Sequence, residues 1–182
     1  MREIIRLLSL NHHVQPEVKE LKLHLIFTAL VFSLAGPALS QEPVVGVANS
    51  DALFTSPDPV LNRNKQTTYR IIKELLEAGH WDRADQYLTE RYIQHNPNAA
   101  SGRQGVVDYF TKVLKVTPKP IPEKMQTKIV SVVAEGDLVT VAFPREMKDP
   151  KDPSKTYTTT WFDSWRFVDG KADEHWDSAL KQ

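Results

Sequence analysis

Several residue types and motifs are absent from this sequence, and each absence excludes a class of chemistry. The 182 residues contain no cysteine, which rules out disulfide frameworks, thiolate zinc sites and cysteine nucleophiles. The 23 basic side chains balance the 23 acidic ones, so no general attraction to nucleic acid or to an anionic membrane is expected. The sequence also lacks a glycine-rich phosphate loop and a serine in a nucleophile-elbow motif.

Long apolar runs are scarce too, and the one that stands out covers residues 23–34. It is short for a membrane span but has the length of a signal-peptide core. Lysines precede it, and Ala38 and Ser40 follow at the spacing that signal peptidase reads. We therefore expect residues 1–40 to be a signal peptide with a long n-region, cleaved after Ser40. The protein would be exported, periplasmic or secreted, with no stable membrane anchor; an uncleaved anchor helix is the alternative.

The remaining chain divides into a lead-in and one domain. Residues 41–61 mix Pro, Gly, Ser, Asn and Asp, which predicts a flexible segment. Residues 62–182 have the length of one domain. In its first half, apolar side chains fall at helical spacing in three stretches: Tyr69, Ile72 and Leu76; Trp81, Ala84 and Leu88; Val106, Phe110 and Val113. Ser101 and Gln104 form a possible capping box before the third helix.

The second half of the domain is typical of β-strands. Two β-branched runs, 127–134 and 138–143, flank a hairpin signal at Gly136. Two longer runs, 156–168 and 171–180, flank Asp169-Gly170, a strong two-residue hairpin signal. Helices followed by an antiparallel sheet predict the α+β class.

Three short motifs give this layout a family resemblance. They are YIQHNP at 92–97, FDSWRFVDGK at 162–171 and EHWD at 174–177. In this order, and after such helices, they resemble the SnoaL-like polyketide cyclase family of the nuclear-transport-factor-like superfamily. The resemblance covers about residues 62–180. It implies a cone-shaped, curved antiparallel sheet packed on three N-terminal helices, with a closed-ended pocket.

The pairing of the last two strands decides which side chains could line that pocket. A two-residue loop at Asp169-Gly170 pairs Val168 with Lys171, and the same register then sets these pairs: Arg166 with Asp173, Ser164 with His175, and Phe162 with Asp177. The family pattern places His175 and Asp177 in the pocket, so Ser164 and Phe162 are expected beside them. The opposite face would carry Trp161, Asp163, Trp165, Phe167 and Trp176, with the tryptophans packing against helices or in a dimer interface. A β-bulge would exchange the two faces.

The resemblance implies acid–base chemistry on a small apolar or carbonyl-containing ligand, without a cofactor or metal. Family members include cyclases that close polyketide rings by aldol condensation, and such a reaction needs one proton removed and another delivered. On this view Asp177 is the main proton-transfer group, assisted by His175 and His95. The expected substrate-binding residues are Tyr92, Asn96, Phe162, Ser164 and Trp81.

Other interpretations of the same residues stay open. The superfamily also contains isomerases, dehydratases and binding domains, so a non-catalytic module for a small molecule or peptide is the main alternative. His175 and Asp177 could be a structural pair, and His95 and Asn96 could cap a turn. A metal site of His95, His175 and Asp177 is a lesser alternative. We also expect a homodimer through the convex face of the sheet, which would cover its exposed apolar side chains.

Overall fold

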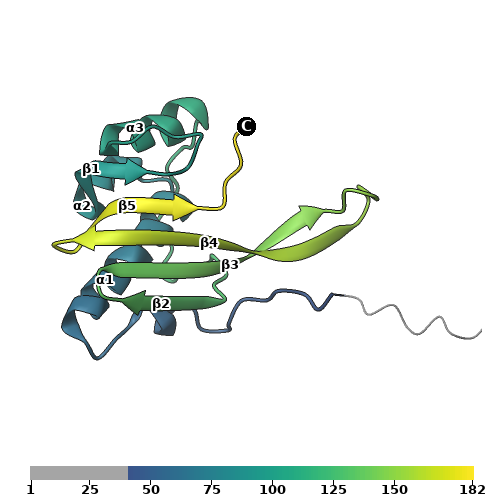
Figure 1. Ribbon diagram of the computed structural model, residues 1–182, viewed down its shortest axis with the longest axis horizontal. Coiled ribbons are helices and arrows are strands. Elements are labelled where there is room, and N and C mark those ends of the chain that lie inside the picture. The colour runs from purple at the N-terminus through teal and green to yellow at the C-terminus, as the bar shows by residue number, and fades with distance from the viewer. Residues whose placement is uncertain (1–40) are drawn as a thin grey trace, which may run out of the picture. The chain divides into compact units, whose positions relative to one another are not determined.

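In the computed structural model, which describes residues 41–182, the chain builds its helices first and its main sheet afterwards (Figure 1). The expected signal peptide, residues 1–40, lies outside the described residues. Among the helices of residues 41–182, none is both long and apolar enough to cross a membrane.

The first long helical segment is an α-helix that continues directly into a π-helix. Helix α1 (Pro59–Arg70) starts at Asp58, whose carboxylate accepts hydrogen bonds from the backbone N–H groups of Val60 and Leu61, both at 2.9 Å. This cap and the proline in the first turn fix the start of the helix. The chain continues as a π-helix, η2 (Ile71–Glu77), and turns at Gly79, whose φ of 77° favours glycine.

The second helical region is short, and the third has the same two-part construction as the first. A 3₁₀ turn, η3 (Trp81–Arg83), leads into α2 (Ala84–Tyr87). Helix α3 (Arg103–Asp108) continues into a π-helix, η4 (Tyr109–Val113). The capping box predicted before α3 is wrong: Gly102 is the N-cap residue and no side chain caps the helix, while Ser101 Oγ accepts a hydrogen bond from the Gln94 N–H at 3.0 Å.

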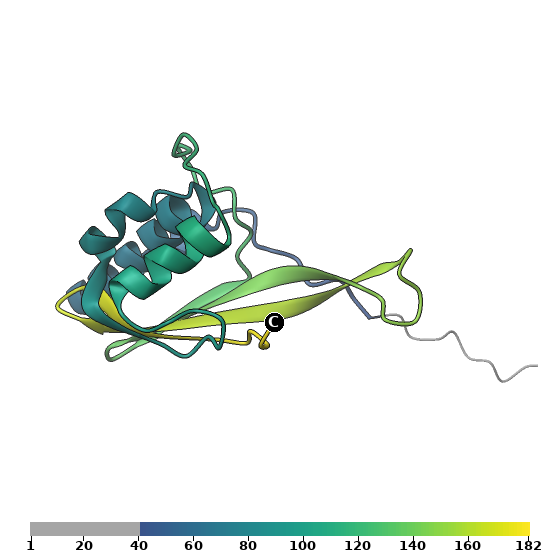
Figure 2. The same cartoon turned by 90° about the horizontal axis from the view of Figure 1, so that it is seen from above.

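The sheet has five strands in the order β1-β5-β4-β3-β2. The strands are β1 (Leu88–Gln94), β2 (Ser131–Glu135), β3 (Leu138–Lys148), β4 (Thr156–Val168) and β5 (Lys171–Asp177). Four of them form the predicted antiparallel meander, but β1 pairs with β5 in parallel. The sheet is therefore mixed and is not closed. The helices lie on one of its faces (Figure 2), and the α+β class is confirmed.

The core lies between the helices and the covered face of the sheet. Its fully buried side chains come from both layers: Phe54, Ile72, Leu75, Leu88, Ile129, Val139, Val141 and Trp165. Phe54 belongs to the segment 41–61, which was expected to be a flexible lead-in. A 3₁₀ turn, η1 (Asp51–Phe54), carries it into the core, and the side chain of Gln66 donates a hydrogen bond to its carbonyl oxygen at 2.9 Å.

Strands β3 and β4 extend past their neighbours as a two-stranded arm (Figure 1). Strand β2 starts opposite Ala142, and β5 ends opposite Asp163. Beyond these points, the segments 143–148 and 156–161 pair only with each other. The base of this arm carries Arg145 and Trp161 beside the body of the domain.

The pairing of β4 with β5 contains one irregularity, and it changes which side chains share a face. The hairpin pairs Val168 with Lys171 as predicted. Arg166 then pairs with Glu174, so Asp173 is an extra residue of β5 without a partner in β4. Such an insertion is a β-bulge. Relative to an unbroken ladder, each residue of β5 after the bulge shares a face with the neighbouring residue of β4 instead of the predicted one.

The buried carboxylate of Asp173 holds the bulge in place. It accepts a hydrogen bond from Thr89 Oγ1 at 2.7 Å and forms an ion pair with Arg91, both in β1. The predicted register is consequently wrong beyond the bulge: Trp165 pairs with His175 and Asp163 with Asp177, in place of Ser164 and Phe162.

Candidate active site

A cavity of about 160 Å³ lies between the helices and the covered face of the sheet. The wide turns of the π-helices η2 and η4 form part of its wall, through residues such as Leu75 and Phe110. Most of the lining is apolar or aromatic: Ile71, Leu75, Leu76, Trp81, Leu88, Tyr92, Ala99, Val106, Tyr109, Phe110, Trp161 and Trp165. The polar lining residues are Gln94, Asn96, Asp163, His175 and Asp177. A mainly apolar cavity with a few convergent polar groups is typical of a small-molecule site.

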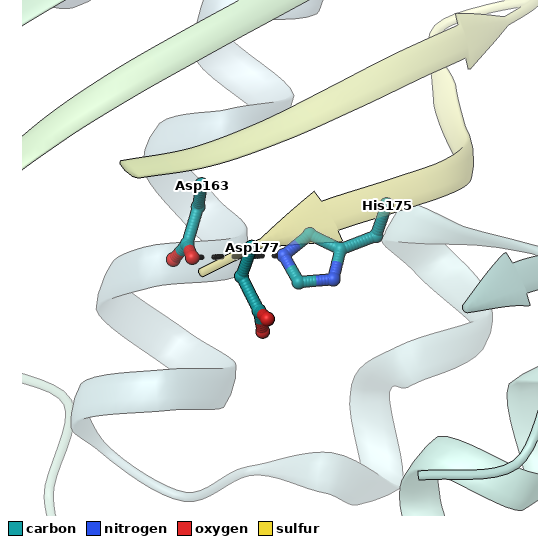
Figure 3. Close-up of side chains that lie close together, drawn as sticks. All are labelled: Asp163, His175 and Asp177. Atoms are coloured by element: carbon teal, nitrogen blue, oxygen red, sulfur yellow. Dashed lines mark ion pairs between the residues drawn. The ribbon is translucent and has the colours of Figure 1, made fainter. Parts of the chain in front are cut away.

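Asp163, His175 and Asp177 come together in this cavity from two neighbouring strands (Figure 3). One side-chain ligand atom of each residue lies within 4.8 Å of those of the other two. Nε2 of His175 is 3.7 Å from Oδ1 of Asp163, and only 9% of the His175 side chain is exposed. The bulge in β5 produces this grouping, because it places Asp163 on the same face as the histidine.

The hydrogen bonds around Gln94 determine which ring nitrogen of a neutral His175 carries the hydrogen. Gln94 Oε1 accepts a hydrogen bond from the backbone N–H of Asn96 at 3.0 Å. The same oxygen lies 2.8 Å from Nδ1 of His175. Because this oxygen can only accept, Nδ1 must donate. The lone pair of a neutral imidazole is therefore on Nε2, the nitrogen nearer Asp163.

Hydrogen bonds orient both carboxylates. Oδ2 of Asp177 accepts from Asn96 Nδ2 at 2.7 Å, and its Oδ1 accepts from the backbone N–H of Ala179 at 2.9 Å. Oδ1 of Asp163 accepts from Nε1 of Trp161 at 2.7 Å. Side chains with fixed rotamers are what proton transfer at a defined atom requires.

Tyr92 supplies a neutral hydroxyl group in the same wall. It is buried, and its oxygen accepts a hydrogen bond from Nε1 of Trp165 at 3.2 Å. Burial raises the pKa of the Tyr92 hydroxyl far above its ordinary value, and the nearby Asp163 and Asp177 act in the same direction. The phenol therefore keeps its hydrogen at neutral pH. Within the described part of the chain, that hydrogen has no hydrogen-bond acceptor.

The family comparison agrees with the fold. The family model described as a SnoaL-like domain matches residues 70–175, which is more than half of the chain. The chain belongs to the SnoaL-like family. The resemblance predicted from the three sequence motifs is thereby confirmed.

Solved structures similar to this SnoaL-like chain are distant in sequence. A proposed SnoaL-like polyketide cyclase from Jannaschia sp. CCS1 is 18% identical, with a TM-score of 0.49, over 68% of this chain and 91% of that chain. A protein of unknown function with a cystatin-like fold from Xanthomonas campestris is 17% identical, with a TM-score of 0.46, over 65% of this chain and 92% of that one. No curated protein matches the chain.

The SnoaL-like domain brings five of the eight predicted site residues to the cavity: Trp81, Tyr92, Asn96, His175 and Asp177. His95 faces away from the cavity: its Nε2 lies 2.8 Å from Glu174 Oε1, and its ring stacks on Trp176. The metal set of His95, His175 and Asp177 is therefore not assembled. With Asp163 in place of His95, two carboxylates and an imidazole make a set that could hold a divalent cation.

The prediction that Phe162 and Ser164 line the pocket is wrong. Phe162 is half exposed on the other face of the sheet, and the hydroxyl of Ser164 is hydrogen-bonded to that of Thr140 at 2.8 Å. The cavity instead receives Trp161, Asp163 and Trp165, which were expected on the opposite face. Only the alternative of a bulge, which the sequence left open, would have indicated these three.

Proposed function

We propose that this SnoaL-like protein is a cofactor-free acid–base enzyme that acts on a small carbonyl compound, by aldol condensation or isomerisation. One observation carries the proposal. A buried imidazole, with Nε2 free of hydrogen bonds among the described residues, lies beside two oriented carboxylates in an apolar cavity. An imidazole can take up or release a proton near neutral pH.

In the proposed reaction, His175 Nε2 removes a proton from the carbon next to the substrate carbonyl. The carboxylates of Asp163 and Asp177 stabilise the resulting imidazolium. The hydroxyl of Tyr92 donates a hydrogen bond to the carbonyl oxygen while negative charge develops on it, as in an oxyanion hole.

The enolate then reacts in one of two ways, and in both the imidazolium returns the abstracted proton to the product. In an aldol step its carbon attacks a second carbonyl group, and the imidazolium returns the proton to the new alkoxide. In an isomerisation the same proton returns to a different carbon. Neither route needs an external oxidant, reductant or group donor.

In this proposal the main proton-transfer group is His175, and not Asp177 as expected from the sequence. Both oxygens of Asp177 already accept hydrogen bonds, from Asn96 and Ala179. Nε2 of His175 has no such partner within residues 41–182. Asp177 then acts through the imidazolium that it stabilises.

A non-catalytic binding module remains the second candidate, supported by the mainly apolar lining of the cavity. Two groups in the cavity favour the enzyme, because an apolar ligand would leave Nε2 of His175 and the hydroxyl hydrogen of Tyr92 without partners.

Exchange of protons for deuterium distinguishes the two candidates. Small ketones, aldehydes and 1,3-dicarbonyl compounds are incubated with the protein in D₂O, and the loss of the proton next to the carbonyl is followed by NMR. Some member of the panel should exchange faster with wild-type protein, and His175→Gln should slow this exchange by about 10²–10⁴-fold. His95→Gln, on the outer face, is the matched control and should change nothing. Equal exchange rates for wild type and His175→Gln would contradict the enzyme proposal.

We also propose export and a homodimer for this protein. Export rests on the apolar run at 23–34 and on the small residues behind it. The dimer rests on apolar side chains exposed on the uncovered face of the sheet, among them Val133 and Phe162, which are 62% and 50% exposed.

A further inference from the structure

An open groove of about 430 Å³ continues outward from the cavity at the base of the β3–β4 arm. Leu76, Trp161 and Asp163 line both hollows. The other lining residues are half apolar and half polar or charged: Ile72, Phe143 and Pro144; Glu77, Thr127 and Arg145. A ligand could therefore pass from one hollow into the other along the indole of Trp161.

The size of the inner cavity limits what it can hold alone. Its volume of about 160 Å³ is close to that of an apolar cavity of about 150 Å³ that accommodates benzene. One ring or a short chain fills such a space. A substrate large enough to contain two reacting carbonyl groups on a carbon framework would extend past Trp161 into the groove.

The groove carries one cationic side chain in the described part of the chain, Arg145. Its guanidinium lies over the ring of Trp161, 4.0 Å from the ring centroid. This stacking fixes the positive charge of Arg145 beside Trp161, where the cavity and the groove meet. Among the described residues, Arg145 has no carboxylate partner within ion-pair distance.

The two acidic residues of the groove have their own donors. Oε2 of Glu77 accepts hydrogen bonds from the N–H and the hydroxyl of Thr127, and both of its oxygens accept from the N–H of Gln126. Asp163 accepts from Trp161. Arg145 is therefore left to bind an external anion, and the charge of Asp163 disfavours an anionic group at the inner end.

We propose that Arg145 binds an anionic group, a carboxylate or sulfonate, on the outer part of the substrate. The inference rests on the proposed function and narrows its substrate class: the neutral carbonyl end enters the cavity, and the anionic end stays in the groove. Arg145 would thereby fix the direction in which the substrate enters. A guanidinium matches the geometry of such oxyanions by paired N–H···O bonds.

Two fluorescent dyes with the same ring system test this inference with the full chain. One is 8-anilino-1-naphthalenesulfonate, and the other is its neutral parent, N-phenyl-1-naphthylamine. Wild-type protein should bind the sulfonated dye more tightly. Arg145→Gln should weaken binding of the sulfonated dye by about five- to tenfold, as expected for one partly exposed charge-assisted contact, and leave the neutral dye unchanged.

Lys148→Gln is the matched control, because it removes a charge from the same strand but outside the groove. It should leave the affinity for both dyes unchanged. Arg145→Lys, which keeps the charge, should retain part of the preference for the sulfonated dye over the neutral dye. Circular dichroism melts check that each variant folds.

An equal affinity of wild-type protein for both dyes, or an equal loss for both in Arg145→Gln, would overturn the anion site. The dyes report binding only, so this outcome is separate from the proton exchange assay. Unchanged exchange in His175→Gln would overturn the acid–base function whatever the dyes show.

Discussion

Trp165 lies directly opposite His175 in the β4–β5 ladder, with the two ring centroids 5.1 Å apart. The indole is almost fully buried and donates its N–H to the hydroxyl of Tyr92. This pair fixes the imidazole between the sheet and the helices, and it exists because Asp173 is inserted as a bulge two residues earlier. The bulge, the ring pair and the proposed acid–base group are thus one structural unit, and the predictions below address its parts and its surroundings.

Asp177→Asn should lower turnover of a carbonyl substrate by about 10²-fold while leaving ligand affinity nearly unchanged. Asparagine keeps the shape of the side chain but removes the negative charge that stabilises the imidazolium. Steady-state kinetics give turnover, and displacement of a fluorescent ligand gives affinity. Asp137→Asn is the control, since Asp137 pairs with Arg166 away from the cavity. Full activity of Asp177→Asn would show that this carboxylate takes no part in the reaction.

Asp173→Asn should destabilise the fold by about 1–3 kcal/mol at neutral pH, because it weakens a buried, charge-assisted network. The hydrogen bonds from Arg91, followed by that from Thr89, lower the pKa of Asp173. A lowered pKa means that the unfolded chain binds the proton more readily than the folded chain. The contribution of the Asp173 carboxylate to the free energy of unfolding is therefore complete above the unfolded pKa near 3.8. It is lost as the pH falls through the lower pKa of the folded state.

Urea unfolding of wild type and Asp173→Asn at pH 7 and below pH 3 tests this sign. The difference between the two proteins should shrink at the lower pH. Asp152→Asn, at an exposed carboxylate of the β3–β4 loop whose pKa is also lowered, should change the melting temperature little. A difference that grows on acidification would contradict the argument.

Phe54→Ala should lower the free energy of unfolding by about 3–5 kcal/mol, the range for truncation of a buried phenylalanine. Phe54 is fully buried, although it precedes the first long helix. Val45→Ala, at a side chain that is 72% exposed, is the control from the same segment. Denaturant titration should separate the two variants clearly; a small effect at Phe54 would mean that the lead-in does not support the core.

Phe162→Glu should convert the proposed dimer into a monomer, because a charge would be placed in the apolar interface. Sedimentation velocity at micromolar concentration measures the mass. Val113→Glu, which changes an exposed side chain on the helical side, should leave the mass of the assembly unchanged. A wild-type monomer under these conditions would exclude the dimer.

Export predicts that the mature chain begins at Gln41. N-terminal sequencing of protein purified from the producing cell measures this directly. Replacing Ala38 with a bulky residue such as Phe should block cleavage, since signal peptidase requires a small residue there. A mature chain that begins before Leu23 would contradict export by this signal.

Local sequence signals sufficed for the two hairpins and for the first helical segment of this fold. They failed at Leu88, which was expected in the second helix and instead begins strand β1. Asp169-Gly170 forms the predicted turn with Val168 opposite Lys171, and Gly79 ends the first helical segment with a positive φ. These features depend on a few neighbouring residues and their backbone preferences. The same holds for the family, because its motifs are short and contiguous.

The sequence by itself therefore determined the α+β class, the family and the presence of His175 and Asp177 in the pocket wall. Tertiary structure decided which residues join them. The bulge at Asp173 depends on Thr89 and Arg91, more than eighty residues earlier in the chain, and β1 pairs with β5 in parallel across the same distance. A register shift of one residue reverses every side chain beyond it. The cavity is lined by Asp163, and not by Phe162 as predicted, because a contact between distant strands fixed the register of β4 against β5. The local alternation of side chains did not determine it.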